Sequence, residues 1–185
     1  MAKSETRRRN RSPSVKSKPL AHTAVAKKTV HHMDFEALTN VNREVVALTK
    51  EEHEYSAADG RMLRALVKEV EGRGQSEDFR DAVAEKVALL VYEIARGQYF
   101  RAGNKRTALL AGLVFLAKNG RTIDIKNPDL VATVDKVGIA AADLEDLHSV
   151  MAGLMAESKP ERKGWSGLIR GAVDDNRAYL TELAS

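Results

Sequence analysis

RGQYFRAGNKRTALLAGLVFLAKNG, residues 96–120, places a glycine and two basic residues directly before a long apolar stretch. From residue 104 onward the apolar residues recur at helical spacing, which predicts a buried helix. The pair Asn119-Gly120 is typical of a helix C-terminus. Gly112 lies inside this pattern, where glycine costs about 1 kcal/mol relative to alanine. We therefore expect another helix to pack closely against Gly112.

The expected start of this helix is Gly103-Asn104-Lys105-Arg106. Backbone N–H groups in the first turn of a helix have no partners within the helix, and the helix dipole adds partial positive charge there. With two cationic side chains, such a turn suits a phosphate or another anion. It is not a P-loop, which needs Gly-x-x-x-x-Gly-Lys-Ser/Thr after a strand. Spacing alone leaves an anion-binding turn and an ordinary charged helix start both open.

Helical periodicity also runs through most of the chain outside this stretch. We expect helices within residues 33–48, 55–75, 76–97 and 161–183, and two shorter ones within residues 128–155, the second starting near Asp143. We expect the helix within 76–97 to be central in the core, with Ser76 as its N-cap, and a turn at Asp59-Gly60. Residues 121–125 fit a short strand or an extended connection. With hardly any alternating strand pattern, the sequence predicts an all-α helical bundle.

The charge is unevenly distributed along the chain. Residues 1–32 hold nine lysines and arginines against one acidic residue, whereas the whole chain has a formal charge of +4. This segment also lacks helical or strand periodicity, so we expect a disordered basic tail. It fits an arm that contacts nucleic acid, or a leader that only aids solubility. The candidate nucleic-acid-binding residues are Arg7, Arg8, Arg9 and Arg11.

The chain divides into three parts at the sequence level: the tail (1–32), a helical domain (33–157) and a C-terminal helical extension (158–185). There are no cysteines, which excludes disulfides and thiolate metal sites and favours a reducing compartment. No stretch resembles a secretion signal or a membrane span. We expect a cytoplasmic protein without a membrane partner.

The stretch from Asn42 to Gly120 resembles the Fic/Doc family, in its Doc branch of death-on-curing toxins. The segments VNREVVAL (41–48) and AEKVALLVYEIARGQYFRAGNKRTALLAGLVFLAKNG (84–120) carry the likeness. The family motif is His-x-Phe-x-(Asp/Glu)-Gly-Asn-(Gly/Lys)-Arg. This sequence supplies in register Phe100, Gly103, Asn104, Lys105 and Arg106.

The resemblance implies a helical domain that moves AMP or phosphate from ATP or another nucleotide to a protein hydroxyl, usually with Mg²⁺. It also implies a target protein and, for the Doc branch, a separate antitoxin. By likeness, Gly103 and Asn104 form part of an anion cradle. Lys105 and Arg106 hold phosphates, and Phe100 anchors the loop in the core.

Two positions depart from the family motif. Gln98 stands at the place of the histidine, and an amide has no basic site near pH 7 to take a proton from a hydroxyl. Such general-base assistance is worth about 10²- to 10⁴-fold. Ala102 stands at the place of the acid and offers no side-chain oxygen to Mg²⁺. We therefore expect lost or altered transfer activity and poor retention of Mg²⁺, and we assign no residue as a metal ligand.

Other residues are weighed as replacements for the missing groups. His31, His32 and His53 fit solvated side chains better than catalytic ones, and Glu93 fits an exposed helical glutamate. Two readings of function stay open: a transferase with an altered loop, and an inactive binding protein of the same fold whose basic arm contacts nucleic acid or a ribonucleoprotein.

Overall fold

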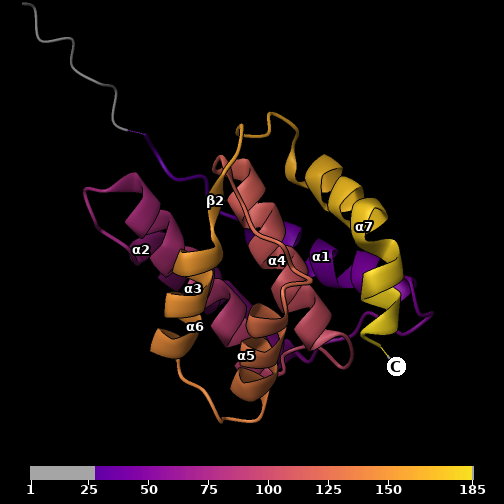
Figure 1. Ribbon diagram of the computed structural model, residues 1–185. Coiled ribbons are helices and arrows are strands. Elements are labelled where there is room, and N and C mark those ends of the chain that lie inside the picture. The colour runs from indigo at the N-terminus through magenta and orange to yellow at the C-terminus, as the bar shows by residue number, and fades with distance from the viewer. Residues whose placement is uncertain (1–27, 185) are drawn as a thin grey trace, which may run out of the picture.

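The structure, a computed structural model, describes residues 28–184, which form seven helices and one pair of very short strands (Figure 1). The predicted all-α class is confirmed. The helices are α1 (Phe35–Ala47), α2 (Ala57–Gly72), α3 (Phe79–Gly97), α4 (Asn104–Lys118), α5 (Pro128–Gly138), α6 (Leu144–Leu154) and α7 (Trp165–Glu182). The strands β1 (Arg121–Thr122) and β2 (Ala156–Glu157) pair antiparallel.

Helices α3 and α4 pack against each other at the centre of the bundle. Helix α3 also contacts α2, α5 and α6, whereas α4 contacts α1 and α7 (Figure 1). The prediction of a central helix within residues 76–97 is thus confirmed. The loop of residues 98–103 joins these two central helices, so its position is fixed by the core.

Gly112 lies where α4 packs closely against α3. A β-carbon built at Gly112 would lie 2.7 Å from the Cγ2 atom of Val91, which is a stiff, buried side chain on α3. The expected close packing at Gly112 is therefore confirmed.

Changing Gly112 to alanine tests this contact. Helix propensity alone would stabilise the protein by about 1 kcal/mol, but overpacking a core costs about 1–3 kcal/mol. We expect a net loss of up to about 2 kcal/mol in the free energy of unfolding, measured by urea denaturation. Gly171→Ala in α7 is the matched control, because its β-carbon would meet no atom within 4 Å. The control should stabilise, and a stabilised Gly112→Ala would contradict the packing argument.

Two local predictions are wrong. Asp59-Gly60 is not a turn but lies in the first turn of α2, where Asp59 and the N-cap Ser56 bond reciprocally in a capping box. The N-cap of α3 is Asp78 rather than Ser76, and its carboxylate accepts from the N–H groups of Arg80 and Asp81. Asp, Gly and Ser favour turns and helix starts alike, so their presence did not fix the exact position.

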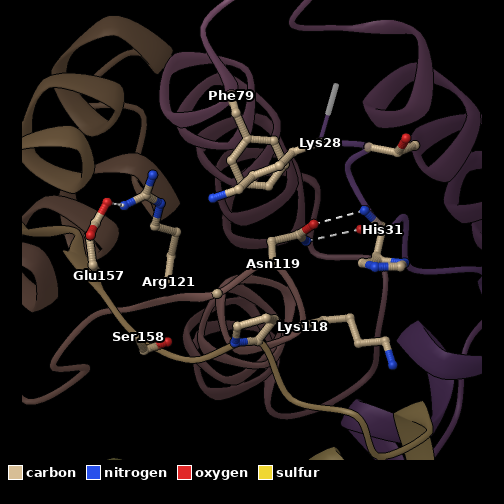
Figure 2. Close-up of a pocket in the computed structure, with 11 residues that line it drawn as sticks. Lys28, His31, Phe79, Lys118, Asn119, Arg121, Glu157 and Ser158 are labelled. Carbon is tan, nitrogen blue, oxygen red and sulfur yellow. Dashed lines mark hydrogen bonds and ion pairs between the residues drawn. The ribbon is translucent and has the colours of Figure 1, made fainter. Parts of the chain in front are cut away.

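The last residues of the predicted tail, 28–32, are among the described residues. The backbone of His31 is held by Asn119, whose Oδ1 accepts from the His31 N–H at 2.7 Å and whose Nδ2 donates to the His31 carbonyl at 3.0 Å (Figure 2). The backbone at His31 is thus bound to the end of α4. The candidates Arg7, Arg8, Arg9 and Arg11 lie outside the described residues.

The C-terminal segment belongs to the same bundle. Helix α7 packs on α1 and α4 and buries Leu168, Ile169, Val173 and Leu180. Among the helices of residues 28–184, none combines the length and apolar composition that crossing a membrane requires.

Candidate anion-binding site

Gln98 ends α3 and turns the chain toward the loop. Its backbone is left-handed, with φ 50° and ψ 43°, and its side-chain Nε2 donates to the carbonyl of Ala95 at 2.6 Å. The amide is therefore directed back to its own helix end. A non-glycine residue in this conformation costs about 1–2 kcal/mol, which the side-chain bond partly offsets.

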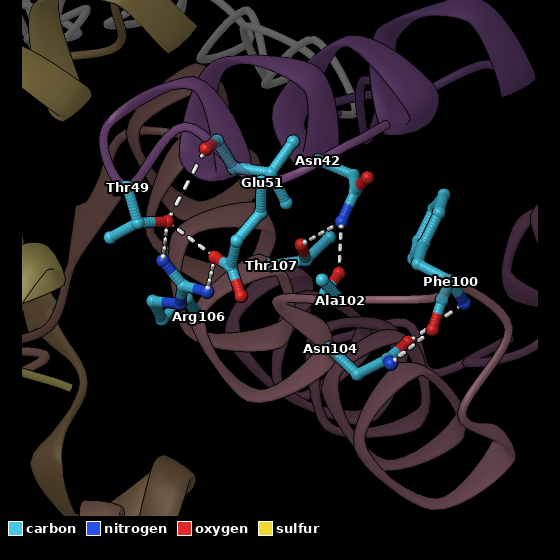
Figure 3. A network of polar contacts seen from close by, with 9 residues as sticks. Asn42, Thr49, Glu51, Phe100, Ala102, Asn104, Arg106 and Thr107 are labelled. Atoms are coloured by element: carbon cyan, nitrogen blue, oxygen red, sulfur yellow. Dashed lines mark hydrogen bonds and ion pairs between the residues drawn. The ribbon is translucent and has the colours of Figure 1, made fainter. Parts of the chain in front are cut away.

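Asn104 closes the loop at its other end. Its Oδ1 accepts from the N–H of Phe100 at 3.0 Å, and its Nδ2 donates to the carbonyl of Phe100 at 2.6 Å (Figure 3). The Phe100 ring is buried and packs near the rings of His53 and Tyr55. Because both atoms of its side-chain amide are used, Asn104 braces the loop and its amide is not directed outward to a ligand.

Asn42 on α1 connects the same loop to two further elements, a role that was not predicted from the sequence. It is fully buried, and its Nδ2 donates to the carbonyl of Ala102 at 2.9 Å and to Oγ1 of Thr107 at 3.0 Å (Figure 3). Its Oδ1 lies 2.7 Å from Nδ1 of His53. The available signal was a polar residue on the apolar face of α1, between Leu38 and Val45.

His53 is part of this network and is not a solvated loop histidine as expected. Asn42 Nδ2 already donates twice, so the Asn42 Oδ1 atom faces the ring and His53 donates from Nδ1. Burial, and secondarily the charge of Arg43, lowers the pKa of His53 below its usual value. The ring is therefore neutral at pH 7 and holds the loop in place.

Gly103 allows the loop to enter α4. Its φ is 74°, and a β-carbon there would lie 3.0 Å from Cγ1 of Val46 and 3.3 Å from Cγ1 of Val45. Both the left-handed backbone and the tight approach to α1 favour glycine. Gly103 is the N-cap of α4, and no side chain caps this helix start. The first turn thus keeps the partial positive charge that binds anions.

The two basic residues of the turn are each paired with a carboxylate. Arg106 is buried and donates to Glu51, which follows α1, and to Oγ1 of Thr49 at 3.0 Å (Figure 3). The hydrogen bond from Arg106 lowers the pKa of Glu51. The Nζ atom of Lys105 lies 2.7 Å from Oδ1 of Asp135 on α5. An anion at this turn must therefore compete with two carboxylates of the protein.

A model of the Fic/DOC family matches residues 21–116, which is 96 of the 185 residues. The chain belongs to the Fic/DOC family. The matched range reaches from before α1 to the last turn of α4 and includes the whole loop. Comparisons with curated proteins and with solved structures gave no match.

The position expected to carry the acid of the Fic/DOC motif offers no metal ligand here. Ala102 has no side-chain oxygen, and its carbonyl already accepts from Asn42. Within the described part of the chain, no three histidine, cysteine, aspartate or glutamate side chains are grouped so that they could hold a metal ion. These residues do not fit Mg²⁺, which prefers a shell of carboxylate and water oxygens.

The other residues considered as substitutes for the missing base and acid do not supply these groups to the Fic/DOC loop. His31 lies against Asn119, past the opposite end of α4. Glu93 is half-buried rather than exposed, and its carboxylate accepts from the hydroxyl of Tyr99 at 3.3 Å. Burial and the nearby Glu93 raise the pKa of Tyr99 to about 12, so this hydroxyl stays protonated.

Proposed function

We propose that this Fic/DOC domain binds a phosphate-bearing nucleotide at the start of α4 and does not carry out the ordinary transfer to a protein hydroxyl. The observation that carries the proposal is the pair of substitutions in the loop. The Gln98 amide is bonded to the carbonyl of Ala95, and Ala102 has no carboxylate. The residues proposed to bind the nucleotide are retained, whereas the residues needed for transfer are replaced. We therefore expect binding without transfer.

The proposed nucleotide binding depends on the start of α4. In this proposal the uncapped N–H groups that follow Gly103 receive phosphate oxygens, and Lys105 and Arg106 supply charge. The Lys105 pair with Asp135 is partly exposed, and such pairs contribute only about 0–1 kcal/mol. A phosphate with a charge near −2 competes well for that ammonium. Arg106 is more firmly held, because its guanidinium is buried against Glu51.

The loss of transfer follows from proton chemistry. A protein hydroxyl must lose its proton as it attacks a phosphorus atom, and Gln98 cannot accept that proton. The missing base alone removes about 10²- to 10⁴-fold in rate. Ala102 adds the loss of a metal ligand, so the charge that develops on the phosphates is poorly neutralised.

Calorimetric titration of ATP, with and without Mg²⁺, tests the binding half. We expect binding by the unmodified protein that is largely independent of Mg²⁺, and about tenfold weaker binding by Lys105→Gln, since losing a charge-assisted contact costs about 1.4 kcal/mol. Lys126→Gln removes the same charge from an exposed site and should bind as the parent does. Equal affinities in both variants would contradict the assignment of Lys105. Asn104→Ala is a poor test, because it also breaks the brace to Phe100.

Glu51→Gln should have the opposite effect on the same titration. Removing the carboxylate that pairs with Arg106 eliminates the strongest competitor for the phosphate, so we expect ATP to bind about 5- to 10-fold more tightly, or roughly 1 kcal/mol. The neighbouring Glu52→Gln makes the same charge change but affects only an exposed pair with Arg101. If both variants tighten binding equally, net charge rather than Arg106 accounts for the gain.

A second candidate function is a toxin-like transferase, favoured by the family match across the whole loop. It requires a target protein and an antitoxin, and growth arrest on expression would support it.

The basic segment 1–32 is separately proposed to contact nucleic acid, with affinity that falls steeply with salt. Deleting residues 1–27 should abolish such binding if the arm provides it.

A further inference from the structure

A cavity of about 330 Å³ lies at the other end of α4 from the Fic/DOC loop (Figure 2). Arg106 and Lys118, the last residue of α4, are 12 residues apart, which corresponds to about 18 Å along the helix. The walls come from the start of the described chain, the first residue of α3, the end of α4, the two short strands and the segment that follows β2. The lining residues include Lys28, Phe79, Arg121, Glu157 and Pro160.

Arg121 gives this cavity a buried donor without a partner. Its side chain is only 10% exposed, and its Nη1 donates to Oε1 of Glu157 at 2.6 Å. Its Nε is buried and has no hydrogen-bond partner within residues 28–184. Buried donors are rarely left unpaired, because losing hydration without a replacement bond is costly. The Nε–H group is therefore expected to bind an acceptor from beyond residues 28–184.

The charges around Arg121 favour an anion as that acceptor. Lys28 places its ammonium 5.6 Å from the centre of the Phe79 ring and forms no ion pair with a described residue. Glu157 is the single carboxylate of the lining, and its side chain is 86% exposed. An exposed carboxylate of this kind is held weakly, so an anionic group of a ligand can replace it as the partner of Arg121. The ammonium of Lys118 is engaged elsewhere, with the carbonyl of Lys163.

The helix end does not oppose an anion at this place. The last carbonyls of a helix carry partial negative charge, but Asn119 covers the carbonyl of Phe115 with a bond of 2.8 Å. The same side chain holds the backbone of His31, so this wall is fixed. Phe79 and Pro160 add apolar surface to the lining. The cavity thus combines one anion-seeking end with a place for an apolar group, as small-molecule sites commonly do.

We propose that this cavity binds a small molecule that carries one anionic group, either a carboxylate or a phosphate. The anion accepts from Arg121 Nε and lies near the Lys28 ammonium, displacing Glu157, while the apolar part of the ligand contacts Phe79 and Pro160. This site shares no residue with the nucleotide site proposed above. Its test is therefore independent of that function.

The experiment is a titration of the isotope-labelled full chain with benzoate and, separately, with inorganic phosphate, followed by NMR. We expect saturable shifts of the amides of Gly120, Arg121 and Ser158 and of the Arg121 Nε–H. Tighter binding of benzoate identifies a carboxylate ligand with an apolar body, and tighter binding of phosphate identifies a phosphate ligand. Shifts that stay linear and never saturate with both probes would overturn the proposal.

Three variants make the result specific. Arg121→Gln should weaken binding about tenfold or more, because the charged donor is lost. Glu157→Gln should tighten it by roughly threefold, since the competing carboxylate is neutralised while the amide oxygen can still accept from Arg121. Arg162→Gln changes an exposed arginine two residues after Pro160 and should have no effect. Unchanged binding in Arg121→Gln, or weaker binding in Glu157→Gln, contradicts the site even if one variant folds poorly.

Discussion

Replacing Asn42 with alanine is expected to lower the free energy of unfolding by about 3 kcal/mol, from about 1 kcal/mol for each of three lost hydrogen bonds. The change leaves the Ala102 carbonyl, the Thr107 hydroxyl and His53 without their buried partner. For a chain of this size the loss corresponds to a fall in Tm of about 6–12 °C. Urea and thermal unfolding measure it directly.

Asn40→Ala is the matched control for this change. Asn40 lies on the same helix, but its contact is an exposed bond of 3.3 Å from Arg43. We expect its effect to stay within about 0.5 kcal/mol. If Asn42→Ala also cost less than about 1 kcal/mol, the network would not hold the loop as described.

Restoring the family residues with Gln98→His and Ala102→Asp is expected to raise transfer from ATP by about 10²- to 10⁴-fold, which is the usual worth of a general base. The left-handed backbone at residue 98 does not oppose the change, because histidine is among the residues enriched at positive φ. The aspartate adds an oxygen for Mg²⁺. The assay follows labelled AMP and labelled phosphate onto protein, with the two single variants alongside.

The added change Lys105→Gln provides the control for that gain. It should reduce transfer by the restored protein, because the nucleotide is then held less well. A restored double variant that folds and binds ATP but transfers nothing would contradict a site impaired only at these two positions.

The helices and the position of the loop could be predicted because their signals are local. Apolar spacing within residues 76–97 and from residue 104 onward located the two central helices, and Gly112 indicated their close approach, which the structure confirms. The turn predicted at Asp59-Gly60 was wrong because aspartate and glycine suit a turn as well as the first turn of a helix. The capping box with Ser56 decided between them.

The polar contacts of the site could not be predicted, because they join residues far apart in the chain. Asn42 reaches Ala102 and Thr107 across 60 and 65 positions, and Arg106 reaches Glu51 across 55. Only the packing of α1 against α4 brings these groups together. The motif gave the residue types for anion binding but not the carboxylates that compete with the anion.

The most direct test of the central claim is a ³¹P NMR spectrum of ATP mixed with the unmodified protein and followed over several hours. The phosphate resonances report binding through shifts or broadening, and new resonances report chemistry. Our account predicts shifted or broadened ATP signals that Lys105→Gln diminishes, with no pyrophosphate, AMP or ADP accumulating. The appearance of those products, or an ATP spectrum unchanged by the protein, would contradict it.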